Sequence, residues 1–233
     1  MAESCALYYI TDRTAFPGDE RTRRLCLLDK IAEAASHGVD YIQLREKDLP
    51  ARDLESLARE AMRIINKLRT ENQELRTALL VNSRTDLAMA VAANGVHLPA
   101  NDVSPEEVRA IWKCGAGAPS TSSGQAPARE LSPQNPLIAV SCHSPQKVAQ
   151  AAANHATFAV FAPVFEKKDS PATSPAGLQA LREACRAAIP VLALGGVTLQ
   201  NVRSCLQAGA AGIAAIRLFQ ENDIAMIVRE LRA

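Results

Sequence analysis

Short apolar runs alternate with longer amphipathic runs along almost the whole of this 233-residue chain. Short apolar runs predict buried β-strands, whereas amphipathic runs with a period of 3.6 residues predict α-helices. Strands that alternate one by one with helices pair in parallel, because each helix carries the chain back across the sheet. The predicted strands are Leu7–Ile10, Tyr41–Leu44, Leu79–Val81, Gly95–Leu98, Leu137–Ser141, Ala159–Val164, Val191–Leu194 and Ile213–Ile216. The helices predicted to follow them are Arg23–Ser36, Ala51–Leu68, Asp86–Ala93, Pro105–Trp112, Pro145–Asn154, Gly177–Ala187, Leu199–Ala208 and Ile224–Leu231.

Eight strand–helix units in a chain of this length favour a closed (β/α)8 barrel, the TIM barrel, over an open doubly wound sheet. The composition agrees, because hydrophobic residues make up 48% of the chain and aromatic residues only 4%. Ala, Val, Ile and Leu suit a barrel interior covered by helices. We therefore expect a single α/β domain over residues 1–233. The Gly-, Ala-, Ser- and Pro-rich stretch Gly115–Pro136 is predicted to be a flexible insertion on the face away from the active site.

Charge and hydropathy exclude two classes of partner. The formal net charge of +1 gives no electrostatic basis for binding nucleic acid. No apolar run approaches the roughly 18 residues of a membrane span, and the first run, Cys5–Ile10, is too short for a signal peptide. The six cysteines show no C-x-x-C or zinc-site spacing, so we expect reduced thiols and a cytoplasmic protein.

The strongest candidate for chemistry is the segment from residue 41 to residue 47. Gln43, Arg45 and Lys47 alternate with the apolar residues Ile42 and Leu44. On a strand the polar three share one face, so we expect them to point into the barrel and toward the mouth at its C-terminal end. Inward-facing cations are costly unless they meet an anion. The segment therefore predicts a phosphate or pyrophosphate clamp; the alternative is that these residues are solvated where the strand becomes a loop.

Polar residues also follow three other predicted strands. Asn82 is the first polar residue after the third strand, and Asp102 lies just beyond the fourth. Asp102 is expected either to bind Mg²⁺ or to cap the helix that begins near Pro105. Ser141 and His143 share one face at the end of the fifth strand. His143 either exchanges protons near neutral pH or is an ordinary loop histidine.

The last three strands offer further anion-binding groups. Lys167 and Lys168, after the sixth strand, either reach the same anion as Arg45 or form a solvated pair of charges. The paired glycines Gly195 and Gly196 expose backbone N–H groups where barrels often bind phosphate. Ile216 and Arg217 end the eighth strand, and Arg217 is expected to add positive charge to that site.

Several short motifs follow one another in a characteristic order. They are Tyr9-Ile10-Thr11-Asp12-Arg13, Gln43-Leu44-Arg45-Glu46-Lys47, Val81-Asn82, His97-Leu98, Pro163-Val164-Phe165 and Gly195-Gly196-Val197-Thr198. In this order the chain resembles the family of thiamine phosphate synthase and its sister group, the thiazole tautomerases (TenI). The resemblance covers nearly the whole chain apart from Gly115–Pro136, and the Gln-x-Arg-x-Lys strand is its most specific part.

The resemblance implies a TIM barrel that carries out a Mg²⁺-dependent transfer between two phosphorylated small molecules. Hydroxymethylpyrimidine pyrophosphate would lose pyrophosphate, and the nitrogen of a thiazole phosphate would attack the resulting carbocation to give thiamine phosphate. Such chemistry needs stabilisation of the departing charge more than a strong base. The positions that the resemblance assigns are Gln43, Arg45, Lys47 and Asn82 for the pyrimidine pyrophosphate, Ser141 beside the reacting centre, Gly196, Ile216 and Arg217 for the thiazole phosphate, and Asp102 with position 83 for the metal.

Three departures from the family pattern keep alternatives open. Ser83 stands where synthases usually carry a metal-binding aspartate, Glu166-Lys167-Lys168-Asp169 replaces a Thr-rich stretch, and Arg217 replaces a small serine. The tautomerases show similar departures and use a histidine at the position of His143, so a thiazole tautomerase is the alternative enzyme. A barrel that binds a thiamine precursor without catalysis is the non-enzyme alternative. The sequence leaves the oligomeric state open, a homodimer included.

Overall fold

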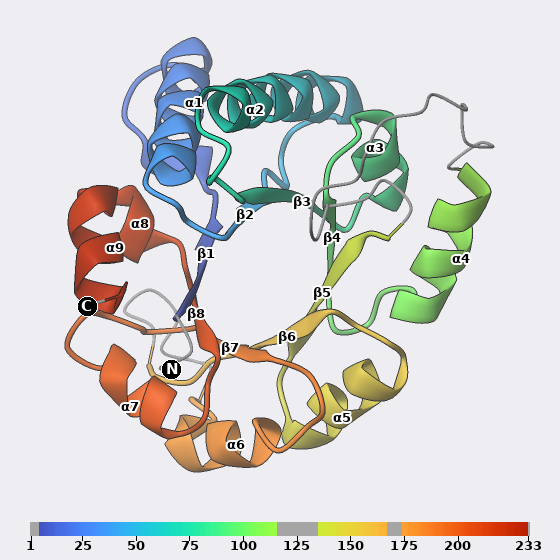
Figure 1. Ribbon diagram of the computed structural model, residues 1–233, viewed down its shortest axis with the longest axis vertical. Coiled ribbons are helices and arrows are strands. Elements are labelled where there is room, and N and C mark those ends of the chain that lie inside the picture. Colours follow the sequence, from blue (N-terminus) through green and yellow to red (C-terminus); the bar gives the residue numbers. More distant parts are fainter. Residues whose placement is uncertain (1–4, 116–134, 167–173, 233) are drawn as a thin grey trace.

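The chain folds into a closed barrel of eight parallel strands, and helices surround it (Figure 1). This computed structural model describes residues 5–115, 135–166 and 174–232. The first strand pairs with the second and also with the eighth, which closes the barrel. The predicted (β/α)8 barrel is therefore confirmed. The strands are β1 (Ala6–Ile10), β2 (Tyr41–Leu44), β3 (Ala78–Asn82), β4 (Gly95–Leu98), β5 (Leu137–Cys142), β6 (Phe158–Phe161), β7 (Val191–Ala193) and β8 (Gly212–Ala215).

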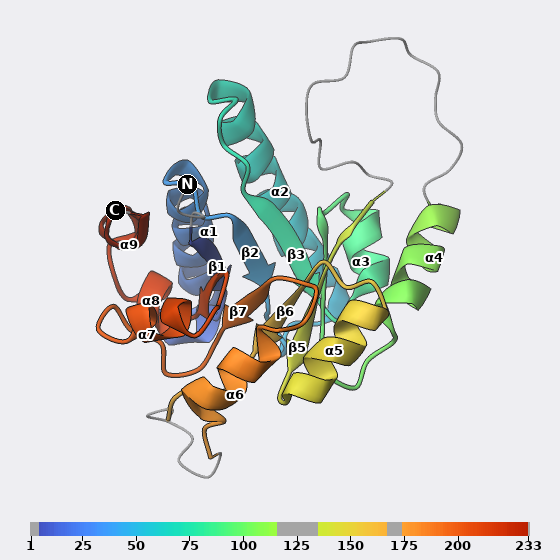
Figure 2. The same ribbon diagram turned by 60° about the horizontal axis from the view of Figure 1, so that its bottom comes forward.

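Helices follow the strands and form the outer layer. They are η1 (Arg13–Ala15), α1 (Glu20–Ser36), α2 (Ala51–Glu71), α3 (Thr85–Ala90), α4 (Pro105–Gly115), α5 (Pro145–Ala153), α6 (Gly177–Ala184), α7 (Val202–Gln207), α8 (Arg217–Gln220) and α9 (Ile224–Arg232). Figure 2 shows the long helix α2 reaching past the end of the strands it covers. The outer ring closes where α9 meets α1, because the Ile224 N–H donates to Glu33 Oε1 over 2.9 Å. None of the helices in the described ranges is both long and apolar enough to cross a membrane.

Side chains of alternate strand residues build two separate cores. On β1, Leu7 and Tyr9 pack between the strands and the helices, whereas Tyr8 and Ile10 fill the barrel interior. This is the period-2 alternation of a strand with both faces buried. Ile42 and Leu44 belong to the outer core, as predicted, so the alternate residue Gln43 faces inward. The larger residues of the interior are Tyr8, Ile10, Leu80, Phe158, Val160 and Leu192.

Two short helices were not predicted from the sequence. The segment η1 has three residues and α8 has four, and neither is long enough to show a helical period. The predicted eighth strand is one residue too long at its end, because β8 ends at Ala215. Arg217 is the first residue of α8 and does not belong to the strand. The predicted insertion Gly115–Pro136 falls largely on residues 116–134, which lie outside the described residues.

Two strands begin at glycines because the neighbouring backbone leaves no room for a side chain. A Cβ atom added to Gly212 would lie 2.0 Å from the carbonyl oxygen of Ala6 on β1. A Cβ atom added to Gly95 would lie 1.9 Å from the carbonyl oxygen of Leu137 on β5. Backbone atoms cannot move aside as the end of a side chain can, so glycine is a condition of strand pairing at both positions.

Replacing Gly212 is therefore expected to weaken the closure between β1 and β8. Gly212→Ala should lower the free energy of unfolding by about 3 kcal/mol or more, because overpacking against backbone forces the strands apart. Gly38→Ala is the matched control, since Gly38 has φ of +78° but its Cβ would meet only the Arg232 guanidinium, at 3.5 Å. The control should cost about 1 kcal/mol, from the left-handed backbone alone. Urea denaturation of both variants measures the difference, and equal losses would contradict the steric explanation.

Candidate active site

The mouth of the barrel gathers polar side chains from strands that are distant in sequence. All strands run in parallel, so their carboxyl ends meet at the same rim. Gln43 Nε2 on β2 donates to Asn82 Oδ1 on β3 over 2.7 Å. Asn82 Nδ2 in turn donates to Ser83 Oγ over 3.0 Å. The predicted residues Gln43, Asn82 and Ser83 are thus joined at one edge of the mouth.

Arg45 and Lys47 lie next to this edge with their positive charges close together. Arg45 is half-buried and Lys47 is exposed. The charge of Arg45, followed by partial burial, lowers the pKa of the Lys47 ammonium below its usual value. Neither side chain forms an ion pair with a carboxylate among the described residues. Two cations that repel each other, with no counter-ion in that part of the chain, form a site suited to a multiply charged anion.

A buried ion network holds this cationic segment in place. Glu46 is only 3% exposed, and it accepts hydrogen bonds from Thr11 Oγ1 at 2.5 Å and from Arg13 Nη1 at 3.2 Å. Arg13 is also buried and bonds both oxygens of Asp48 at 2.7 Å. Hydrogen bonding to Asp48, ahead of the other carboxylates, raises the pKa of Arg13 above its usual value. Because the Arg45 N–H donates to Thr11 Oγ1 over 3.0 Å, the network also fixes the backbone of Arg45.

A second network runs through the barrel interior. Tyr8 and His97 are buried, and the Tyr8 hydroxyl lies 3.0 Å from His97 Nδ1. His97 Nε2 lies 2.7 Å from Ser141 Oγ. Burial, together with the charge of Arg45, lowers the pKa of His97 to about 3, so its imidazole is neutral near pH 7. Ser141 is half-buried at the mouth, which makes it the outer end of this chain of hydrogen bonds.

Asp102 lies on the connection from β4 to α4, and its carboxylate is exposed. Its Oδ1 accepts a hydrogen bond from the Val103 N–H at 2.9 Å. The residue that caps α4 is Ser104, because Ser104 and Glu107 exchange hydrogen bonds in a capping box. Of the two roles predicted for Asp102, capping of α4 is therefore wrong.

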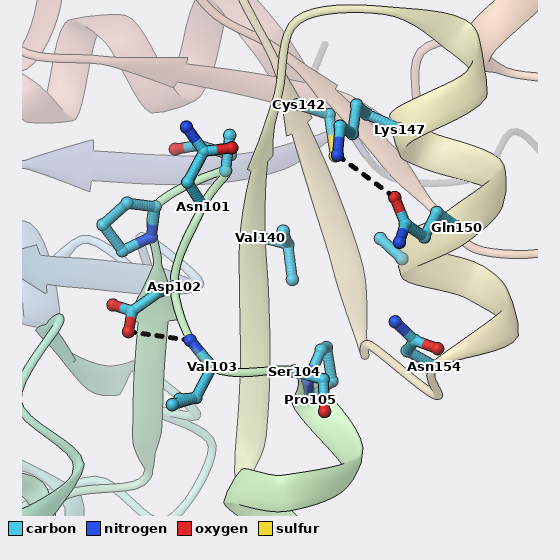
Figure 3. Close-up of a pocket in the computed structure, with 14 residues that line it drawn as sticks. Asn101, Asp102, Val103, Ser104, Pro105, Val140, Cys142, Lys147, Gln150 and Asn154 are labelled. Atoms are coloured by element: carbon cyan, nitrogen blue, oxygen red, sulfur yellow. Dashed lines mark hydrogen bonds between the residues drawn. The ribbon is translucent and has the colours of Figure 1, made fainter.

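Asp102 borders a pocket that also reaches Ser141 (Figure 3). The pocket holds about 250 Å³ and lies between residues 99–105 and α5. Val140 and Cys142 line it from β5 and belong to the outer side of the strand, so the pocket adjoins the mouth without being the barrel interior. Metal-ligand clusters of three or more His, Cys, Asp or Glu residues are absent from the part of the chain that the structure describes.

His143 is exposed just after β5, and its Nδ1 lies 2.7 Å from the carbonyl oxygen of Ala162 after β6. A carbonyl oxygen can only accept, so Nδ1 carries a proton. In the neutral tautomer with this proton, the lone pair is on Nε2. His143 is thus anchored at the rim with one nitrogen able to take a proton.

At the predicted phosphate site after β7 and β8, the backbone turn is constrained by close packing and by a side-chain hydrogen bond. Gly195 and Gly196 have φ of +95° and +66°, and a Cβ atom on Gly196 would lie 2.5 Å from the Glu166 carbonyl oxygen. Asn201 Nδ2 donates to the Gly196 carbonyl over 2.8 Å, which closes the turn. Ile216 and Arg217 stand at the start of α8. Lys167 and Lys168 lie outside the described residues.

Reasoning from the sequence missed the residues that support the site from inside. Tyr8, Thr11, Arg13, Glu46 and His97 received no role, although all five occur in or beside the motifs of the family. The available signal was a polar residue within a buried strand or directly after one. That signal does not name a partner, because each partner comes from a different strand.

Comparison with known proteins identifies the family. The sequence model of the family described as thiamine monophosphate synthase matches residues 7–118 and 119–219. The chain is 36% identical to a thiamine-phosphate synthase of Methanoculleus marisnigri, over 97% of this chain and 93% of that protein. It is 32% identical to a thiamine-phosphate synthase of Syntrophomonas wolfei, over 97% and 94%. The structure of a thiamine phosphate pyrophosphorylase from Pyrococcus furiosus superposes with a TM-score of 0.73 and 26% identity, covering 99% of this chain and 95% of that one.

The matches extend over nearly the whole barrel and include every strand that contributes to the mouth. By sequence and by fold, this chain belongs to the thiamine monophosphate synthase family.

Proposed function

We propose that this protein is a thiamine phosphate synthase, which joins hydroxymethylpyrimidine pyrophosphate to a thiazole phosphate and releases pyrophosphate. The observation that carries the proposal is the pair of cations Arg45 and Lys47, which lie at the mouth without a carboxylate partner among the described residues. A purely structural pair would be expected to have a counter-ion, as Arg13 does. The family membership supports the same reaction.

The residues at the mouth suit a reaction in which an anion departs. The C–O bond to the pyrophosphate breaks, its electron pair leaves with the pyrophosphate, and the thiazole nitrogen forms the new bond to carbon. Arg45 and Lys47 stabilise the charge that builds up on the leaving group. Gln43 and Asn82, already fixed by their mutual hydrogen bond, orient the pyrimidine pyrophosphate. We assign Ser141 to the side of the reacting atoms and Gly196, Ile216 and Arg217 to the thiazole phosphate. Lys168, which lies outside the described residues, is proposed to bind the pyrophosphate.

We propose that Asp102 and Ser83 would hold a Mg²⁺ ion together with the pyrophosphate of the substrate. Mg²⁺ is usually held by one or two carboxylates together with substrate phosphates. Asp102 supplies one exposed carboxylate that no helix needs as a cap. Ser83 supplies a neutral hydroxyl on the side of Asn82. When bound, such an ion supplies additional positive charge to the pyrophosphate.

The direct test is to incubate the purified protein with both precursors and Mg²⁺ and to assay thiamine phosphate and pyrophosphate. Formation of both products in equal amounts supports the proposal. Their absence, with intact precursors recovered, would refute it. The same protein is also assayed with the thiazole carboxylate phosphate alone.

That second assay addresses the alternative activity, a thiazole tautomerase. The observation in its favour is His143, whose Nδ1 is held by the Ala162 carbonyl while Nε2 keeps a lone pair at the rim. A tautomerase would use this nitrogen to move a proton on the thiazole ring. The synthase needs no such base.

Arg45→Met is expected to keep the fold and to abolish the synthase activity. The substitution removes a charge that has no carboxylate partner among the described residues, so the melting temperature should stay within a few degrees. The value of kcat/KM should fall by at least about a hundred-fold, because the bonds to the departing pyrophosphate are lost. Arg59→Met, which removes an exposed arginine of α2 paired with Glu55, is the control. Full activity in Arg45→Met would remove the basis of the proposal.

His143→Ala separates the two activities. In a synthase the variant should lose only a few-fold in thiamine phosphate formation, because His143 shapes the rim. In a tautomerase the loss should be at least about a hundred-fold, since the residue would be the general base. His37→Ala, which replaces an exposed histidine next to α1, controls for loss of the side chain alone. Loss of all synthesis in His143→Ala, together with tautomerase activity in the parent, would favour the alternative.

Ser83→Asp is expected to bind Mg²⁺ more tightly, so that the reaction needs a lower Mg²⁺ concentration. The backbone of Ser83 has φ of +59°, a conformation that aspartate adopts more readily than most residues, so the variant should fold. The new carboxylate offers Mg²⁺ a second anionic ligand and should lower its half-maximal concentration several-fold. Mg²⁺ titrations at saturating precursors compare the parent, Ser83→Asp and the uncharged control Ser83→Asn. An unchanged titration would show that position 83 is not at the metal.

A further inference from the structure

The three side chains Tyr8, His97 and Ser141 form a hydrogen-bonded line across the barrel. They come from β1, β4 and β5, and the two heavy-atom distances are 3.0 Å and 2.7 Å. Tyr8 is fully buried and His97 is 3% exposed, whereas Ser141 reaches the mouth. The rings of Tyr41 and Phe158 pack against Tyr8, with centroids 5.8 Å and 5.5 Å away. The line is therefore enclosed at its inner end and open at Ser141.

The donors and acceptors along this line follow a fixed order, because only one tautomer of His97 gives the buried Tyr8 hydroxyl proton an acceptor. Among the described residues, the hydrogen bond of the Tyr8 hydroxyl is the one with His97 Nδ1. If Tyr8 donates, Nδ1 accepts and the ring proton is on Nε2. With the opposite tautomer, Nδ1 would donate and the buried Tyr8 proton would have no acceptor in that set. Buried polar hydrogens are almost always bonded, so the first arrangement is favoured.

This order decides where the proton of Ser141 points. The Nε2–H of His97 donates to Ser141 Oγ, so the serine oxygen acts as an acceptor on the inner side. The serine proton is then left for a partner at the mouth. A doubly protonated His97 would again force Tyr8 to accept, and both burial and the nearby charge of Arg45 oppose it. Ser141 is thereby prepared as a donor before any substrate arrives.

We propose that Tyr8 and His97 are positioning residues that direct the hydroxyl proton of Ser141 into the mouth, where it donates to an anionic phosphate oxygen of the substrate. The inference rests on the proposed synthase function for the identity of that oxygen. The protein residues move no proton in this arrangement. The hydroxyl stays intact, and its hydrogen bond strengthens as negative charge develops on the departing group.

The tautomer can be tested without any enzymatic activity. Nitrogen NMR of the full chain labelled with ¹⁵N-histidine distinguishes a protonated ring nitrogen from one that carries only a lone pair. The variants His37→Ala, His143→Ala and His155→Asn assign the remaining resonances to His97. We expect the proton of His97 on Nε2 and none on Nδ1. A proton on Nδ1 overturns the proposal whether or not the protein is a synthase.

The consequence for catalysis is tested by a double-mutant cycle. Tyr8→Phe keeps the ring but removes the donor that fixes the tautomer, so kcat should fall about ten-fold, the value of one hydrogen bond in the transition state. Both KM values should stay within about two-fold, since substrate binding loses no direct contact. In Ser141→Ala, kcat should fall by about a hundred-fold, as expected on losing a hydrogen-bond donor to the developing charge. The double variant should be no slower than Ser141→Ala, because Tyr8 acts only through Ser141.

Tyr9→Phe is the matched control. Tyr9 is equally buried on the same strand, but its hydroxyl donates to Gln220 Oε1 on the outer side of the barrel. This variant should reduce stability as much as Tyr8→Phe without lowering kcat. Additive losses in the double variant, or equal losses of kcat in Tyr8→Phe and Tyr9→Phe, would overturn the positioning role. Absence of synthesis by the parent protein would instead refute the proposed function, and the NMR result would still decide the tautomer.

Discussion

Closure of the parallel barrel is the constraint on which the site depends. Because β1 pairs with both β2 and β8, the sheet has no free edge and all strands end at the same rim. Closure requires the backbones of β1 and β8 to approach so closely that only glycine fits at position 212. The rim then brings Gln43, Asn82 and Ser141 into one mouth, although about a hundred residues separate the first from the last. A chain of local strand–helix units obtains its site only when the last unit pairs with the first.

A second requirement is that the cationic segment after β2 keeps its shape without a substrate. Arg45 and Lys47 repel each other, and the lowered pKa of Lys47 expresses that repulsion. The residue between them, Glu46, is buried and accepts hydrogen bonds from Thr11 and Arg13. Burying a carboxylate is costly unless it is paired, and here a guanidinium and a hydroxyl offset the cost. The alternation of Arg45, Glu46 and Lys47 therefore separates two kinds of group: the two cations have no carboxylate partner among the described residues, whereas the carboxylate between them anchors the loop.

The interior network is of a different kind, because it is neutral. Burial and the charge of Arg45 exclude the imidazolium form of His97, so its two ring nitrogens have opposite roles. The rim thus combines the full charges of Arg45 and Lys47 with one hydroxyl, that of Ser141, which is hydrogen-bonded to a buried neutral imidazole. Ser83 adds a left-handed backbone at the edge of β3, a conformation that suits the aspartate usual in the family.

The sequence by itself determined the fold and the faces of β2, since both follow from local patterns of apolar and polar residues. Alternation along β2 was enough to place Ile42 and Leu44 outward and Gln43 inward, because a strand repeats every two residues. Only the tertiary structure decided which residues are partners. It assigned the cap of α4 to Ser104, which leaves the carboxylate of Asp102 exposed, and it revealed the short helix α8 at Arg217. It also joined Tyr8 to His97 and Arg13 to Glu46, pairs that lie on different strands or loops. Such contacts depend on barrel closure and register, and no local period in the sequence encodes them.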